Sequence, residues 1–215
     1  MSADRQVSAL LKQIATQDVV VVTNEFSHAG RTATLAHVVE HYGFEYAEAR
    51  REGRNKQTLA VYLYRDPAPE ARAREAATIA AHPQAGMGGT VPGLQPGTLK
   101  PTPEAAEAVA RLRDRIGFDV MTQMAAARQM GFAWFCVAAL VVTLLICEMY
   151  VGALAGGAAL AAFLVGGVKI GGLRRQRIAE RLQAAGFTPV QDETGRQRFL
   201  RPGQRLPGHA NPFAT

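Results

Sequence analysis

The sequence predicts an α+β cytoplasmic domain, a two-helix transmembrane hairpin, and a short basic helix with a β-hairpin at the C-terminus. Three observations lead to this fold class. Residues 1–82 alternate helix and strand patterns and carry ten acids and ten bases. Residues 129–168 contain one side chain that is charged at neutral pH, Glu148. Residues 169–215 carry nine bases and three acids, so the net charge of +6 is concentrated after the apolar run.

Side-chain spacing separates helices from strands within residues 1–82. The first apolar stripe has the i, i+3, i+4, i+7 spacing of an amphipathic helix and consists of Val7, Leu10, Leu11 and Ile14. A β-branched run over residues 18–23 favours a buried strand. The expected elements are helix 6–16, strand 18–23, helix 29–42, strand 44–50, strand 57–64 and helix 70–81. This α-β-α-β-β-α order predicts helices packed on a small sheet.

Two segments connect this domain to the apolar run. Residues 83–102 are rich in glycine and proline, which predicts an extended linker with no packing capacity. Thr102 and Pro103 then provide a helix-capping residue and an N1 proline. We therefore expect a juxtamembrane helix over residues 103–128.

The apolar run has the length of two membrane spans. A bilayer core about 30 Å thick is crossed by roughly 20 apolar residues in a helix. Residues 131–147 are rich in Phe, Val, Leu and Ile, whereas residues 151–168 are rich in Gly and Ala. Glu148 and Tyr150 suit a polar turn between them at the membrane face. The prediction is a two-span hairpin over residues 129–170.

The distribution of basic residues predicts an orientation. Bases flank the apolar run on both sides, at Arg111, Arg113, Arg115, Arg128, Lys169, Arg174, Arg175, Arg177 and Arg181. The turn between the expected spans has none. By the positive-inside rule, both termini are expected in the cytoplasm of a multi-pass protein of the cell (inner) membrane.

Small residues in the second expected span are candidates for close helix packing. Gly152 and Gly156 form one GxxxG pair, and Gly167 and Gly171 form another. Such pairs let helix backbones approach closely within a membrane. The spacing leaves two interpretations open: the glycines pack against the first span of the same chain, or they pack between protomers and give a homo-oligomer.

The C-terminal part combines a basic helix with a hairpin signal. Residues 171–200 are expected to form a helix, a strand, a turn and a second strand, followed by a disordered tail over 201–215. Four arginines of the helix are predicted to face anionic lipid headgroups, namely Arg174, Arg175, Arg177 and Arg181.

No catalytic residue, cofactor site or metal site is predicted. The loop from Ser27 to Thr32 lies between a strand and a helix N-terminus, where an anion can bind. Glu25 replaces the first glycine of a phosphate-binding loop and would repel phosphate. His37 and His41 have a spacing compatible with zinc, but the sequence offers no identifiable third ligand.

Three hypotheses for function follow. The first is a non-enzymatic integral membrane protein whose cytoplasmic domain binds a protein partner. The second is an oligomeric pore-forming or membrane-perturbing effector. The third is a membrane protein that handles nucleic acid, with the basic C-terminal segment on phosphate, although nucleic acid is the less expected partner.

Overall fold

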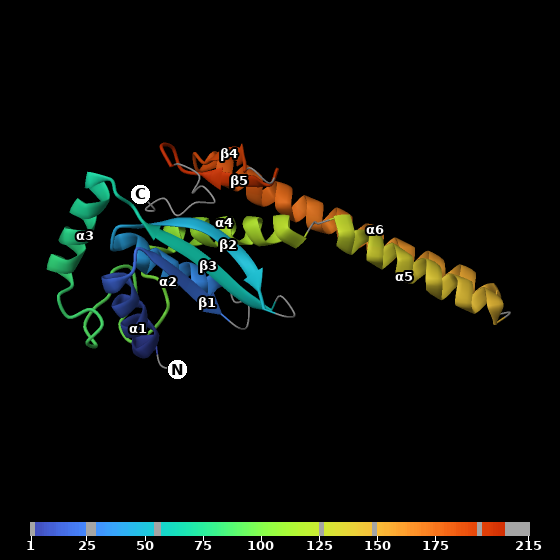
Figure 1. Cartoon of the computed structure of the whole chain (residues 1–215), viewed down its shortest axis with the longest axis horizontal. Coiled ribbons are helices and arrows are strands. Elements are labelled where there is room, and N and C mark those ends of the chain that lie inside the picture. Colours follow the sequence, from blue (N-terminus) through green and yellow to red (C-terminus); the bar gives the residue numbers. More distant parts are fainter. Residues whose placement is uncertain are drawn as a thin grey trace.

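The computed structural model describes residues 3–24, 29–53, 57–124, 127–147, 150–192 and 195–204. The chain forms a mixed α/β head from which two helices project side by side as a long arm (Figure 1). The predicted turn residue Glu148 and the tail residues 205–215 lie outside the described part of the chain.

A three-stranded antiparallel sheet forms the centre of the head. Its strand order is β1-β3-β2, and a register shift between Tyr46 and Glu48 leaves Ala47 as an extra residue in β2. The N-terminal elements are α1 (Ala3–Thr16), β1 (Val19–Asn24), α2 (Ala29–His41), β2 (Phe44–Glu52), β3 (Thr58–Arg65) and α3 (Pro69–Ala81). The predicted order of these six elements is therefore observed, with bounds that differ by a few residues.

Local sequence accounts for the passage from α2 into β2. Gly43 follows the helix with φ +82°, a conformation that glycine adopts without steric cost. A Cβ at this position would lie 3.1 Å from the carbonyl oxygen of Ala71, so the close approach of α3 also requires a small residue. Phe44 can then enter the core as the first residue of β2, where it is 1% exposed.

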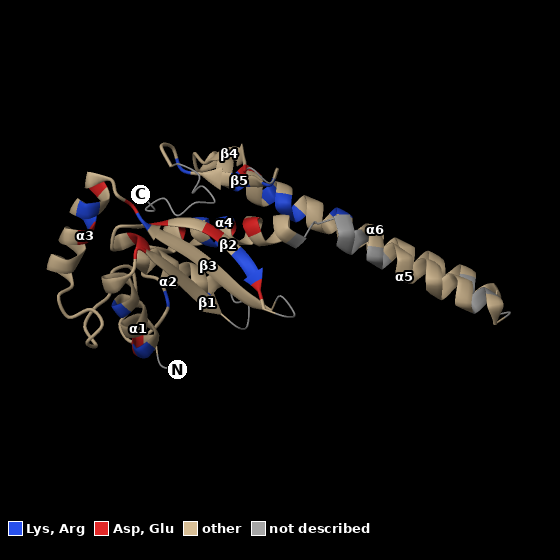
Figure 2. Ribbon diagram, viewed as in Figure 1, with Lys and Arg blue, Asp and Glu red and all other residues tan. Residues whose placement is uncertain are grey.

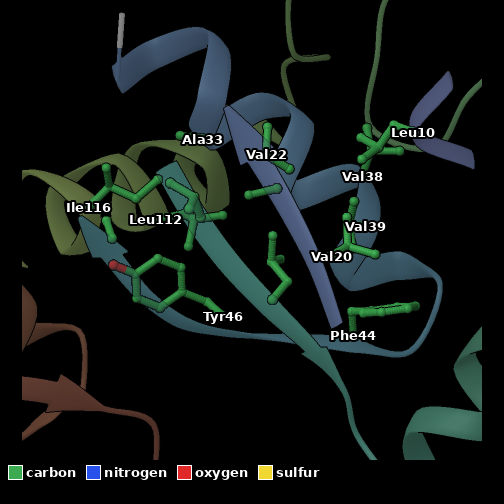
Figure 3. Close-up of a cluster of buried hydrophobic side chains, with 14 of the residues drawn as sticks. Leu10, Val20, Val22, Ala33, Val38, Val39, Phe44, Tyr46, Leu112 and Ile116 are labelled. Carbon is green, nitrogen blue, oxygen red and sulfur yellow. The ribbon is translucent and has the colours of Figure 1, made fainter. Parts of the chain in front are cut away.

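Helix α4 (Ala106–Met124) belongs to the head rather than standing apart from it. Leu112 and Ile116 of α4 are buried in the same hydrophobic cluster as Val20, Val39 and Tyr46 (Figure 3). The segment expected to be a linker also packs here, since Leu94 is buried in this cluster. The expectation that residues 83–102 have no packing capacity was wrong, because glycine and proline turns can still present single apolar side chains to a core.

The arm consists of α5 (Ala127–Ile146) and α6 (Tyr150–Ala184), which pack against each other. One helix, over Leu154–Ala184, is long and apolar enough to cross a membrane by length and composition. Within the described side chains, α5 contributes only a shorter apolar segment, Trp134–Thr143. The predicted fold class was wrong on this point, because the structure shows one candidate membrane-spanning helix and not a two-helix transmembrane hairpin.

The basic segment after the apolar run is not a separate short helix. It is the C-terminal part of α6, which continues for 35 residues, or about 52 Å at 1.5 Å per residue. No proline interrupts it, and α6 re-enters the head beside α4. The hairpin of β4 (Thr188–Gln191) and β5 (Gln197–Leu200) follows after Gly186, which has φ +85°.

A second hydrophobic cluster holds the C-terminal hairpin to the head. Phe118 of α4 contacts the ring of Phe199 edge to face, with ring centroids 4.8 Å apart. The buried members of this cluster are Phe118, Ile178, Leu182, Phe187 and Phe199. Helix α4 therefore contributes to both clusters, and the hairpin is a part of the head.

Replacing Ile116 with alanine tests whether α4 is a core element. Ile116 is fully buried, so the Ile116→Ala variant should lose about 2–5 kcal/mol of unfolding free energy. Urea denaturation of the full chain in detergent micelles, followed by circular dichroism, gives this value. Arg113→Ala, an exposed change on the same helix, should stay within about 0.5 kcal/mol of the parent. Equal effects of the two substitutions would argue against a core role for α4.

Candidate functional site

The arm exposes large apolar side chains to its surroundings along most of its length. Val151 is 82% exposed, Phe163 is 77% exposed and Leu154 is 76% exposed. Exposed apolar surface of this extent is typical of a contact with lipid or with another protein. Figure 2 shows no acidic or basic residue on the described part of the distal arm. The arm therefore has a surface suited to contact with lipid or with another protein.

Basic residues gather where the arm joins the head (Figure 2). Arg174, Arg177 and Arg181 line a groove of about 590 Å³ between α6 and the end of α4, with Met121 on the α4 side. Arg175 is exposed but does not line this groove. Helical spacing explains the difference, since positions 174, 177 and 181 share one face of α6.

Two carboxylates near this groove do not fully offset its three arginines. Arg181 Nη1 lies 3.4 Å from Asp114 Oδ2 of α4, and Glu180 lies on the groove wall. Arg174 and Arg177 have exposed side chains and make no ion pair within the described residues. The groove can therefore offer guanidinium groups to an anion at the base of the arm.

The structure separates the glycines of α6 by their surroundings. A Cβ built on Gly157 would lie 2.7 Å from Val141 Cγ2 of α5, so the two helices approach closely there. Cβ atoms on Gly156, Gly167 and Gly171 would meet no described atom within 4 Å. The surroundings of Gly152 lie outside the described side chains. The glycine that packs against α5 was thus missed by the sequence analysis, although it adjoins a predicted one.

A second group of charged residues lies inside the head, where α4, β2 and the C-terminal segment meet. Arg115 of α4 is 2% exposed and lies against two aromatic rings, 4.6 Å from the ring centre of Tyr46 and 5.1 Å from that of Phe187. Its Nη2 atom donates hydrogen bonds to the Phe199 carbonyl and to Gln204 Oε1, each at 2.9 Å. Burial lowers the pKa of Arg115 from its usual high value.

Two carboxylates near Arg115 are already engaged by other groups. Arg201 Nη2 donates to both oxygens of Glu40 at 3.0 Å. Asp119 Oδ2 accepts a hydrogen bond from the Tyr46 hydroxyl at 2.6 Å. Burial raises the pKa of Asp119, and the charge of Arg198 opposes that shift without cancelling it. These contacts join residues 40–46 to residues 115–119 and to residues 198–204, so they link three distant parts of the sequence.

The C-terminal segment also satisfies the open edge of β2. Arg198 Nη2 donates to the carbonyl of Ala47, and Gln204 Nε2 donates to the carbonyl of Tyr46 at 2.8 Å. The bulge in β2 exposes these two carbonyls in sequence. Residues 201–204, expected to begin a disordered tail, are thus fixed to the sheet edge by side-chain hydrogen bonds.

The histidine pair is arranged as a contact within the head. His41 Nε2 and His37 Nε2 lie 3.3 Å apart, and His37 Nδ1 lies 3.9 Å from Glu40 Oε2. Within the described residues, no group of three or more His, Cys, Asp or Glu side chains is placed to hold a metal ion. Ser27 and His28 of the candidate anion loop lie outside the described residues, whereas residues 29–32 form the first turn of α2.

Comparison with known proteins gave no relative. No protein-family model matches the chain, and neither a curated protein nor a solved structure matches it. Its function is therefore inferred from the residues of the chain itself.

Sequence reasoning identified the arginines at the base of the arm but missed those inside the head. Arg115 and Arg201 were not predicted as site residues, since one looked like a membrane-flanking charge and the other lay in an expected tail. One signal was available for Arg115. It lies three residues after Leu112 and directly before Ile116, on the apolar side of its helix.

His41 and Glu40 predict a specific dependence of stability on pH. Burial and the adjacent His37 lower the pKa of His41, so the unfolded chain binds this proton first as the pH falls through about 6.5. Stability is therefore full above that pH and falls below it. Urea midpoints measured from about pH 8 to about pH 5 should show this loss, and His41→Gln should flatten it.

Glu40 adds a second loss at lower pH. Burial acts to raise its pKa, but the neighbouring His37 ring and the charges of Arg201 and Arg115 outweigh burial and lower it. Its contribution is present above the unfolded value of about 4.3 and disappears as the pH falls through the folded value. Glu40→Gln should reduce this loss in urea midpoints measured below about pH 4.3, and a loss equal to the parent's would contradict the assignment.

Proposed function

We propose that the chain is a non-enzymatic membrane protein whose apolar helix α6 inserts into a bilayer and whose head is held at the anionic surface of that bilayer. The observation that supports this most strongly is the direct succession, along α6, of exposed apolar side chains and exposed arginines. Moving the apolar part of this helix out of water costs little free energy. Its basic part gains free energy from contacts with phosphate groups.

The base of the arm supplies the headgroup contact in this proposal. Arg174 and Arg177 line the groove beside Met121, so a lipid phosphate can meet guanidinium donors while an acyl chain lies along the apolar surface. Arg175 contributes its charge from the neighbouring face of α6. Lys169, which is exposed between the apolar and basic parts, fits the interface between hydrocarbon and headgroups.

The proposal places the head on the cytoplasmic side of the cell (inner) membrane. The chain enters the arm at the end of α4 and leaves it where α6 packs against α4 again, so both flanking segments lie on one side. Both of these segments carry arginines, and flanks with Lys or Arg are retained in the cytoplasm.

The free face of the sheet is the part of the head that we assign to a protein partner. Leu59, Val61 and Leu63 of β3 point into the core, so Tyr62 and Tyr64 point to the opposite face. Both tyrosines are partly exposed and donate hydrogen bonds to glutamates of β2. A sheet face that combines tyrosine rings with fixed polar groups has the composition of a protein-interaction surface.

Vesicle flotation tests the membrane assignment. The full chain, reconstituted from detergent, should float with vesicles that contain phosphatidylglycerol more completely than with pure phosphatidylcholine. Changing Arg174, Arg175 and Arg177 together to glutamine should remove this preference, since each arginine near the surface contributes roughly 1 kcal/mol. The preference should also weaken as salt is raised.

A charge-matched control separates the site from net charge. Arg5, Arg72 and Arg113 are exposed arginines of the head that do not line the groove. Changing these three to glutamine should leave the lipid preference unchanged. Loss of the preference in both triple variants would show a general charge effect, and no preference in the parent would reject the proposal.

The unoccupied glycine surface of α6 favours a second candidate function, an oligomeric membrane-perturbing or pore-forming effector. Gly167 and Gly171 lie one helical turn apart, and a Cβ on either would meet no atom of the described residues within 4 Å. Such a surface permits close approach of a second copy of the helix within a membrane. In this alternative the arm assembles between protomers and the head remains outside the bilayer.

Two glycine variants distinguish packing within one chain from packing between chains. Gly157→Leu should disrupt the contact with Val141 and lower the stability of the arm. Gly167→Leu should leave the arm of one chain intact but abolish crosslinked oligomers in membranes, together with any loss of membrane potential on expression. A crosslinking pattern that Gly167→Leu does not change would remove the oligomer from consideration.

A further inference from the structure

A separate cleft lies in the head between α4 and the segment that follows α6. Its volume is about 470 Å³, which is within the range of small-molecule sites. The cleft is lined by three arginines and five apolar residues, namely Arg111, Arg115, Arg201, Ala108, Leu112, Ala185, Phe187 and Pro202. This cleft shares no lining residue with the groove at the base of the arm.

The innermost of these arginines has hydrogen-bonding capacity left over. Arg115 is 2% exposed, and its Nη2 atom alone makes the hydrogen bonds to Phe199 and Gln204. Within the described residues, its Nε and Nη1 atoms have no acceptor. A guanidinium has five N–H groups, and a buried cation without acceptors is strongly unfavourable. The surroundings of Arg115 therefore favour an anion.

The acidic side chains nearby act on the Arg115 charge but accept no hydrogen bond from it within the described residues. Glu40 receives its hydrogen bonds from Arg201, and Asp119 receives one from Tyr46. The rings of Tyr46 and Phe187 stabilise the Arg115 charge through their faces but accept no hydrogen bond in its plane. Nε and Nη1 of Arg115 thus remain without acceptors beside the cleft, within the part of the chain that the structure describes.

The other two arginines lie closer to the mouth and each retains free donors. Arg111 is exposed and contacts Glu107 through Nη1 at 2.7 Å. Arg201 is 44% exposed at its side chain and contacts Glu40 through Nη2. Each guanidinium therefore has further N–H groups that can turn toward a ligand between them.

We propose that this cleft binds an organic phosphate, with the phosphoryl group between Arg115, Arg111 and Arg201. A phosphate dianion accepts hydrogen bonds from several guanidinium groups at once, and its double charge competes better than a single carboxylate with Glu107 and Glu40. Leu112, Phe187 and Pro202 give the organic part of the ligand an apolar wall. Because these residues come from α4 and from the segment after α6, the ligand also strengthens the contact between them.

Calorimetric titration of the full chain in detergent micelles tests this site. Phenyl phosphate is the probe, with inorganic phosphate to remove the organic part and benzoate to replace the phosphoryl group. Phenyl phosphate should bind saturably with one site per chain and more tightly than either of the others. Arg111→Gln and Arg201→Gln should each weaken it by about tenfold, as expected for loss of a charged hydrogen bond.

Arg113→Gln provides the matched control, because Arg113 is exposed on the same helix and does not line the cleft. It should bind phenyl phosphate as the parent does. Arg111 is a surface residue, so its variant keeps the test valid even if a change at Arg115 unfolds the head. Absence of saturable binding, tighter binding of benzoate, or an equal effect of Arg113→Gln would each overturn the proposal.

Discussion

Helix α4 joins the parts of this protein through one set of packing contacts. Leu112 and Ile116 enter the N-terminal cluster between α2 and the sheet, while Phe118 enters the cluster of the C-terminal hairpin. The same helix packs against the returning end of α6 and leads directly into the arm. The relation between head and arm therefore depends on the burial of these side chains, each of which contributes on the order of 1.5–3 kcal/mol by the hydrophobic effect.

Charged residues specify how the three parts meet, and their position between the two clusters limits access of water. Arg115 lies against two aromatic rings. Arg198 and Gln204 donate hydrogen bonds to the carbonyls at the bulge of β2. Hydrogen bonds of this kind are directional, so they fix a register that apolar packing alone leaves loose. The head can in this way hold the base of the arm, with its exposed arginines, in a defined orientation.

Local patterns in the sequence were sufficient for the head's first six elements, because each has a signal within a few residues. The β-branched run gave β1, and Gly43 before Phe44 marked the end of α2. The arm was less predictable. Hydropathy located the apolar run, but it could not show that α6 continues through the basic segment. No proline or cap marks a stop there, so the helix continues although the hydropathy falls. Glycine spacing likewise could not tell that Gly157 packs against Val141 of α5, whereas a Cβ on Gly156 or Gly167 would meet no atom of the described residues within 4 Å.

The sequence by itself determined that the chain has a small α+β part, an apolar run and a basic segment after it, because composition and periodicity act over short distances. Tertiary structure alone decided that α4 is a core helix, that residues 201–204 close the edge of β2, and that Arg111, Arg115 and Arg201 surround one cleft. These relations join residues up to 161 positions apart, as in the contact of Arg201 with Glu40. Long-range contacts of this kind depend on how whole elements pack, and no local pattern records them.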